Sequence, residues 1–375
     1  MNLVLICLDQ LRPDRLVRQE PWEALRRETA FFPGMITHAP YTIASLHAVV
    51  TGRYGRDTGV DGYTRSPAYR ADRVRSLALR LRDRGYRTYG DLINPLVMPR
   101  QGFDRFQVHD ENRDDLIERH CRLLTDWSRR DPSFIYLHYS TIHTRMVRDV
   151  IGKYGDFDAD YFGRIPENRA RYDGYVREAG DYLTAVWDHM RRSGILDRTV
   201  VALFTDHGCS LGERPGEKCY GVYLYDYTLR VFAHLWTPDR RWAGLGIDAQ
   251  VRTVDLAPTL LDLLGASEPE SGPPPAGESL RPLLDSGGGP DRPAFSETGG
   301  LGGPSPSPDG PNLHAWREPP WKMIVQSDTG AREIYNVTTD PDERENLAGR
   351  HPAPEDDFLR KMQACTARRL PEVRP

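Results

Sequence analysis

The fold is decided by the stretch LVLICLDQ, which occupies residues 3–10 near the start of the chain. Six apolar residues in a row, ending in Asp9 and Gln10, are typical of a strand that is buried on both faces of a parallel sheet. The same apolar pattern recurs at residues 133–139 and 199–205. Three such runs, far apart in the chain, predict neighbouring strands that are joined by long crossover connections.

The segments between these runs favour helices, which we predict at residues 73–84, 115–129 and 168–193. Gly194 follows the third of them. Glycine at this position is typical of a helix end, because it adopts the left-handed backbone conformation without strain. Strands that alternate with helices predict an α/β fold with a parallel sheet and right-handed crossovers.

The last third of the chain has a different composition. Residues 254–264 predict a helix, Gly265 ends it, and glycine and proline then become frequent. Segments 321–326 and 333–337 flank a turn and predict a β-hairpin. We therefore expect an α/β domain at residues 1–285, a Gly/Pro-rich loop at 286–312, and a small C-terminal α+β subdomain with the hairpin at 313–375.

The charge and cysteine content narrow the class of protein. The 375 residues hold 50 Lys and Arg against 54 Asp and Glu, a formal net charge of −4. Such a balance argues against general binding to nucleic acid or to a membrane surface. Five scattered cysteines without a C-x-x-C pair do not form a disulfide framework, and the N-terminus does not resemble a signal peptide. We expect a cytoplasmic protein without a membrane or nucleic-acid partner, in an oligomeric state that the sequence leaves open.

Polar side chains follow two of the predicted strands at their carboxyl ends. Asp9 and Gln10 follow the first strand, and Asp206 and His207 follow the run at 199–205. Ligands of open α/β sheets bind beyond the carboxyl ends of the strands. Two carboxylates, an imidazole and an amide predict a site for a divalent cation there. The alternative is that each Asp serves only as a turn or helix-cap residue.

A third feature is a predicted helix that starts at Thr42, after Pro40, and ends at Thr51 and Gly52. The N-terminus of a helix presents free N–H groups and the positive end of the dipole, so it favours an anion. The alternative is that Thr42 only caps the helix.

Several motifs occur in the order found in one known family. They are the opening strand with its Asp-Gln and Arg12-Pro13-Asp14, then T-G-R-Y at 51–54, F-T-D-H-G at 204–208, L-Y-D at 224–226, D-L-A-P-T-L-L at 255–261, G-E-S-L-R-P-L-L at 277–284, and E-I-Y-N-V at 333–337. In this order they resemble the sulfatase family of the alkaline phosphatase superfamily. The resemblance implies a large, mixed but mostly parallel sheet flanked by helices, together with metal binding by Asp9, Gln10, Asp206 and His207.

The chain departs from this family at the nucleophile. The family's Cys or Ser, which becomes formylglycine, lies nine residues before the Thr of T-G-R, and that position is Thr42. Formylglycine forms only from a primary thiol or alcohol, so Thr42 cannot supply it. The family's G-K-W-H segment, which would fall at residues 89–94, is also absent. These departures argue against a conventional sulfatase.

Threonine nucleophiles are known elsewhere in the superfamily, in nucleotide pyrophosphatase/phosphodiesterases and phosphoglycerol transferases. Asp9, Thr42, Asp206 and His207 match the metal set of those enzymes, and the Asp-Gln pair resembles phosphonate monoester hydrolases. The resemblance implies at least one divalent ion, which would be Zn, Mn, Ca or Mg. For a second ion, His138 and His143 are the nearest candidates.

Two more residues resemble catalytic or substrate-binding positions of the family. His143 resembles the histidine of a P-H-x-P motif, and Lys218 resembles a substrate lysine after D-H-G. Either would neutralise the leaving oxygen or the bound anion. Ser45 is a weak alternative nucleophile because its register differs, and His47 is expected to pack inside the helix layer. The other histidines, including His38, His109 and His120, are read as ordinary.

The expected function is therefore metal-dependent hydrolysis of a small anionic phosphate ester (a phosphodiester, phosphonate or phosphomonoester) through a covalent intermediate on Thr42. Three alternatives stay open at this stage. The first is transfer of a phosphoryl or sulfuryl group to a small acceptor, and the second is hydrolysis of a sulfate ester. The third is a catalytically silent member of the family.

Overall fold

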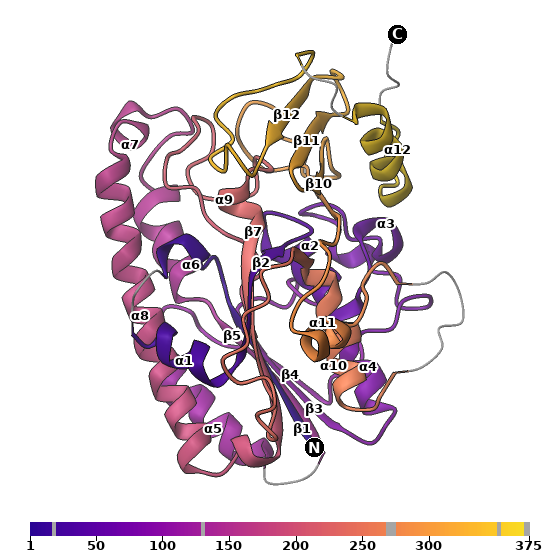
Figure 1. The fold of residues 1–375 in the computed structure, drawn as a ribbon. Helices are drawn as coiled ribbons and strands as arrows, with labels where there is room; N and C mark the ends of the chain where they lie inside the picture. Colours follow the sequence, from indigo (N-terminus) through magenta and orange to yellow (C-terminus); the bar gives the residue numbers. More distant parts are fainter. Residues whose placement is uncertain (17–19, 129–131, 268–274, 351–353, 371–375) are drawn as a thin grey trace.

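The computed structural model describes residues 1–375 except 17–19, 129–131, 268–274, 351–353 and 371–375. Its centre is an eight-stranded sheet (Figure 1). In spatial order the strands are β4 (Arg105–Val108), β3 (Arg87–Leu92), β5 (Ser133–Tyr139), β1 (Asn2–Leu8), β6 (Thr199–Phe204), β7 (Arg230–Trp236), β2 (Ala30–Ile36) and β8 (Val251–Arg252). The strands from β4 to β6 run parallel, whereas β7 is antiparallel to both of its neighbours. The predicted α/β class with a mixed, mostly parallel sheet is confirmed.

Helices cover both faces of this sheet (Figure 1). One face carries α1 (Trp22–Glu28), α5 (Leu116–Ser128), α6 (Thr141–Met146) and α8 (Ile165–Arg192). The other carries α2 (Thr42–Thr51), α4 (Leu77–Arg82), α10 (Leu256–Leu263) and α11 (Arg281–Ser286). The short helices are α3 (Gly55–Thr58), α7 (Ala159–Phe162) and α9 (Asp226–Leu229), and α12 (Glu355–Cys365) lies near the C-terminus. No helix within the described ranges is long and apolar enough to cross a membrane.

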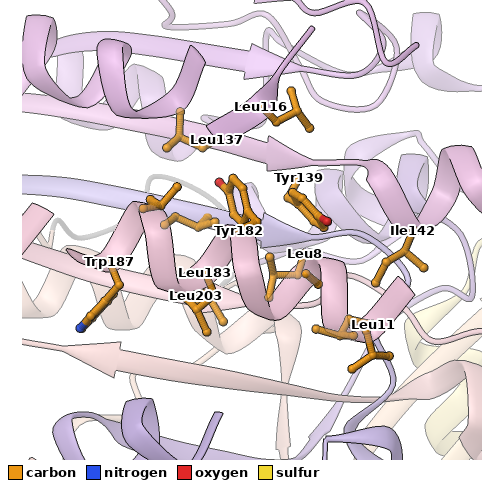
Figure 2. Close-up of a cluster of buried hydrophobic side chains, with 14 of the residues drawn as sticks. Leu8, Leu11, Leu116, Leu137, Tyr139, Ile142, Tyr182, Leu183, Trp187 and Leu203 are labelled. Atoms are coloured by element: carbon orange, nitrogen blue, oxygen red, sulfur yellow. The ribbon is translucent and has the colours of Figure 1, made fainter. Parts of the chain in front are cut away.

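Strand β1 is buried on both faces, as its continuous apolar run predicts. Val4, Ile6 and Leu8 pack in the core on the α8 side, while Leu3 and Leu5 pack in the core on the α2 side. This alternation follows from the two-residue period of a strand. Figure 2 shows the first of these cores, where side chains of β1, β5 and β6 meet those of α5, α6 and α8.

The C-terminal part forms a separate four-stranded antiparallel sheet. Its order is β12 (Arg332–Asn336), β11 (Trp321–Gln326), β10 (Leu313–Glu318) and β9 (Ala294–Thr298). The hairpin of β11 and β12 confirms the predicted one. The loop prediction for residues 286–312 is wrong at 294–298, because β9 is fully buried there and pairs with β10. The small sheet therefore begins before the predicted boundary at residue 313, and the domain division itself stays a prediction.

The predicted helices differ from the observed ones mainly at their ends. Helix α4 begins at Leu77 and not at residue 73, because the Ser76 hydroxyl accepts a hydrogen bond from the N–H of Leu79 and caps the helix. Helix α8 begins at Ile165, with proline in its first turn. The predicted end of the second helix at residue 129 lies outside the described residues.

Candidate metal centre

The side chains that follow β1 and β6 meet at one edge of the sheet. The two strands are parallel neighbours, with Cys7 opposite Phe204, so the residues just beyond them lie side by side. Single donor atoms of Asp9, Asp206 and His207 lie within 4.8 Å of one another, and all three residues are fully buried. The Nε2 atom of His207 is 3.5 Å from Oδ1 of Asp9 and 3.6 Å from Oδ2 of Asp206.

These atoms fit a divalent cation. Among the described residues, neither Oδ1 of Asp9 nor Oδ2 of Asp206 has a hydrogen-bond partner, although both are buried. Buried carboxylate oxygens without a partner are costly unless they are paired or bind a metal. The Nδ1–H of His207 donates to the carbonyl of Gly208 at 2.8 Å, which leaves the Nε2 lone pair facing the carboxylates. Two oxygens and one imidazole nitrogen suit a metal of the zinc or manganese kind.

Asp9 shows the electrostatic cost of this arrangement. Its burial, together with the nearby Asp206 carboxylate, raises the pKa of Asp9 to about 7. Burial lowers the pKa of the neighbouring His138 to about 4, so this imidazole is neutral at pH 7. His138 donates its Nε2–H to Oδ2 of Asp9 at 3.0 Å and accepts from the Tyr136 hydroxyl at Nδ1. His138 therefore binds Oδ2 of Asp9 and orients the carboxylate, while Oδ1 stays without a partner among the described residues.

Thr42 lies at the same edge, in the first turn of α2. Its hydroxyl oxygen is 3.2 Å from Nε2 of His207, and the residue is 8 % exposed. The first N–H groups of an α-helix have no partner within the helix, so the start of α2 offers donors beside this hydroxyl. Ser45 is fully buried, and its hydroxyl donates to the carbonyl of Asp206 at 2.8 Å. Ser45 thus links α2 to the residues that follow β6, and its buried hydroxyl is not accessible from solvent.

Gln10 and His143 form a second contact around the centre. Gln10 adopts a left-handed backbone conformation with φ of 65°, which only a few per cent of non-glycine residues adopt. Its side-chain N–H donates to Nδ1 of His143 at 3.1 Å. Since Nδ1 of His143 accepts this bond, the N–H that the ring can donate lies at Nε2, and the side chain is 20 % exposed, more than those of Asp9 and His207. The role of Gln10 as a metal ligand stays a prediction.

Lys218 is tied to a loop in this structure. Its ammonium group donates to the carbonyl of Tyr154 at 2.5 Å and lies 3.3 Å from the Asp156 carboxylate. Its predicted contact with substrate stays a prediction. Tyr220 is in contact with the centre instead, because its ring centroid is 5.0 Å from that of His207 and 5.7 Å from that of His143. His47 is buried within α2, where its Nδ1 bonds the carbonyl of Ile43, as expected of a packed histidine.

A second buried group was not predicted from the sequence. Asp91, His109 and His120 bring their donor atoms within 4.8 Å of one another, whereas the sequence predicts no special role for either histidine. Asp91 lies at the end of β3, and His109 comes directly after β4. The same rule of strand ends that identified Asp9 would have found them, had the two strands been recognised. Arg119 also binds the Asp91 carboxylate, at 2.7 Å, so this group is internally paired.

Comparison with known proteins gives a consistent result. The sulfatase family model matches residues 1–266. Arylsulfatase K of Xenopus laevis is 26 % identical over 211 residues, which is 53 % of this chain and 37 % of that protein. The multifunctional alkaline phosphatase superfamily protein PehA of Trinickia caryophylli is 29 % identical over 127 residues, 33 % of this chain and 24 % of that protein. The chain thus spans well under half the length of these curated relatives.

A solved structure extends the likeness over nearly the whole fold. The phosphonate monoester hydrolase of Agrobacterium radiobacter superimposes with a TM-score of 0.73 and 17 % identity, covering 93 % of this chain and 92 % of that one. At this identity, the likeness is one of fold.

Proposed function

This chain belongs to the sulfatase family, and from that premise we propose that it hydrolyses a phosphate ester (a phosphodiester, phosphonate or phosphomonoester) through a covalent intermediate on Thr42. The observation that carries the proposal is the 3.2 Å approach of the Thr42 hydroxyl to Nε2 of His207, at the start of a helix and beside the unpartnered Asp9 and Asp206 oxygens. A hydroxyl, an anion-binding helix start and a cation site together suit attack on a phosphorus centre.

The steps follow from the residues present. The Thr42 oxygen attacks phosphorus and releases its proton to solvent, while the bond from phosphorus to the leaving oxygen breaks. The N–H groups at the start of α2 hold the non-bridging oxygens, and the Nε2–H of His143 donates a hydrogen bond to the leaving oxygen, which takes its proton from solvent. Water then attacks phosphorus, releases phosphate or phosphonate, and returns a proton to Thr42. A divalent cation held by Asp9, Asp206 and His207 would lower the pKa of the hydroxyl and offset the charge of the phosphoryl group.

Sulfate-ester hydrolysis is the second candidate, and the name of the Arylsulfatase K relatives favours it. Against it stands Thr42, a secondary alcohol that cannot become formylglycine. The position of the family's sulfate-binding lysine segment also holds Asp91, whose carboxylate faces Arg119, His109 and His120. Both features favour phosphate over sulfate. Transfer to an acceptor alcohol would use the same intermediate, so the acceptor must be determined by experiment.

The test compares Thr42→Ala, Thr42→Ser and a control, Thr51→Ala, at the other end of the same helix. The substrates are p-nitrophenyl phosphate, bis(p-nitrophenyl) phosphate, p-nitrophenyl phenylphosphonate and p-nitrophenyl sulfate, each with added Mn²⁺ or Zn²⁺. We expect Thr42→Ala to lose about a thousandfold or more in kcat, and Thr42→Ser and Thr51→Ala to stay active. The mass of acid-quenched wild-type enzyme should rise by one phosphoryl or phosphonyl group. Full activity of Thr42→Ala would refute the proposal, and turnover of the sulfate ester alone would favour the second candidate.

A further inference from the structure

A loop at the far edge of the main sheet reaches back to the candidate centre. Strand β4 is one of the two edge strands, and the loop after it, residues 109–111, contacts residues on both sides of His143 in the sequence. The Nε2 atom of His109 is 3.0 Å from the hydroxyl of Ser140, three residues before His143. The carboxylate of Glu111 accepts a hydrogen bond of 2.6 Å from the hydroxyl of Thr144, the residue directly after His143. The histidine is thus flanked by two bonds to one loop.

The loop is itself anchored inside the protein. Nδ1 of His109 lies 3.1 Å from Oδ2 of Asp91, and Nε2 of His120 lies 3.0 Å from the same oxygen. Burial alone would raise the pKa of Asp91, but hydrogen bonds from His109, His120 and Arg119 outweigh it and hold this pKa well below its usual range. The carboxylate is therefore charged and carries no proton of its own. Since the carboxylate of Asp91 can only accept, both histidines donate to it, and the second ring nitrogen of His109 is left to hydrogen-bond the Ser140 hydroxyl.

Helix α6 needs such support because it is short. It has six residues, of which Ile142 and Met146 are buried in the core shown in Figure 2, where Ile142 is labelled. The same helix carries His143, which contacts Gln10 at 3.1 Å and whose Nδ1 lies 3.9 Å from Oδ2 of Asp9. A helix of this length gains little stability from its own hydrogen bonds, so its position depends on contacts with its surroundings.

We propose that His109 and Glu111 are positioning residues for the reaction, which brace the start of α6 and thereby hold His143 in reach of the leaving oxygen. The proposal rests on the proposed function, in which the Nε2–H of His143 donates a hydrogen bond to that oxygen. Neither residue touches the reacting atoms. Their effect passes through the hydroxyls of Ser140 and Thr144 to the backbone on each side of His143.

The proposal has a specific kinetic consequence. Loosening the brace misplaces His143 without removing it, so kcat should fall while KM changes little. A misplacement of about 1 Å costs up to roughly 100-fold in rate. The loss should be larger for a phenyl ester than for a p-nitrophenyl ester, because the poorer leaving group depends more on the hydrogen bond from His143 to its oxygen.

The test removes only the two hydroxyls. Ser140→Ala with Thr144→Val detaches α6 from the loop and leaves His143, the loop and the metal ligands in place. Thr144→Val alone serves if the double variant does not fold, and Thr144→Ser should restore activity because it keeps the hydroxyl. The matched control is Thr125→Val, which removes a hydroxyl of α5 that bonds Nε2 of His189 on α8 at 2.8 Å.

We expect the double variant to lose about 10- to 100-fold in kcat with wild-type metal content, and Thr125→Val to stay at wild-type kcat. The decisive comparison repeats the double variant in a His143→Ala background. A positioning role predicts little further loss there, because the group being positioned is gone. An equal fold-loss in both backgrounds would overturn the proposal, and so would wild-type turnover of His143→Ala itself. Neither of these outcomes would argue against the Thr42 intermediate. Full activity of Thr42→Ala would overturn the proposed function, but the comparison of the two backgrounds could still be interpreted.

Discussion

The hydroxyl oxygen of Thr42 lies 3.2 Å from Nε2 of His207, although the two residues are 165 positions apart in the chain. One begins a helix and the other follows a central strand of the sheet. The contact therefore joins the anion-binding end of α2 to the group that carries the unpartnered carboxylate oxygens. We therefore expect a substitution at a candidate metal ligand to alter the proposed nucleophile Thr42, and a shift of α2 to alter the candidate ligands.

Asp206→Asn should remove most of the bound metal. Oδ2 of Asp206 has no other partner in the described chain, and an amide oxygen is a weaker and uncharged ligand. We expect the affinity for Zn²⁺ or Mn²⁺ to fall by more than the roughly 10- to 100-fold that the loss of an outer hydrogen-bond partner costs. Inductively coupled plasma mass spectrometry after dialysis measures the metal content. Asp188→Asn, on the surface of α8, is the control, and equal metal in both variants would contradict the assignment.

Ser45→Ala should lower stability but keep the covalent step. The Ser45 hydroxyl donates to the carbonyl of Asp206 and lies 2.8 Å from that of Thr37, with no exposure. Removing it leaves a buried acceptor less satisfied, which costs about 1–3 kcal/mol in the free energy of unfolding. Urea denaturation measures this loss. The quenched variant should still gain the mass of a phosphoryl group on Thr42, and a missing adduct would restore Ser45 as a candidate nucleophile.

The parts of the fold that the sequence predicts are those with a strong local pattern. The predicted bounds of strands β1, β5 and β6 agree with the structure to within one residue, because a continuous apolar run is typical of a strand that is buried on both faces. Strand β9 was missed because five residues in a Gly/Pro-rich segment carry no such run, and their conformation comes from pairing with β10. Edge strand β4 is mostly exposed and was missed for the same reason.

The candidate site divides in the same way. Asp9, Asp206 and His207 are predicted because they follow recognisable strands, and Thr42 because it starts a helix. The partnership of His143 with Gln10, and of Asp91 with His109 and His120, depends on packing between distant elements. The strand-end rule points to Asp91 and His109 only once β3 and β4 are known, and no local pattern encodes the other contacts.

Lys322→Met should strongly destabilise the junction between the small sheet and the main domain. Lys322 of β11 is fully buried, and its ammonium group lies 2.8 Å from Asp226 and 2.7 Å from Glu343. Removing one partner of a buried ion pair leaves uncompensated charge, at a cost of about 3–5 kcal/mol. The control is Lys361→Met, whose two ion pairs are partly exposed and are worth about 1 kcal/mol or less. Equal urea midpoints for the two variants would contradict this account.

Glu217→Gln should change how stability depends on pH. Glu217 is fully buried, and burial raises the pKa of its carboxyl group from 4.5 to about 7, although Oε1 accepts hydrogen bonds from the N–H groups of Val222 and Tyr223. A group whose pKa is raised on folding binds its proton more tightly in the folded state. Its contribution to stability is therefore complete below pH 4.5 and is lost as the pH rises through 7.

The neutral amide of the Glu217→Gln variant mimics the protonated carboxyl at every pH. We expect wild type and variant to have similar free energies of unfolding near pH 4.5, and the variant to be more stable by up to about 3 kcal/mol above pH 7. Buried histidines such as His138 act in the opposite direction, but equally in both proteins, so the difference isolates Glu217. Glu278→Gln, at an exposed side chain, should follow wild type. Urea titrations from pH 4.5 to 8 that give parallel curves for wild type and Glu217→Gln would show that the carboxyl is charged throughout this range, held by its two N–H donors.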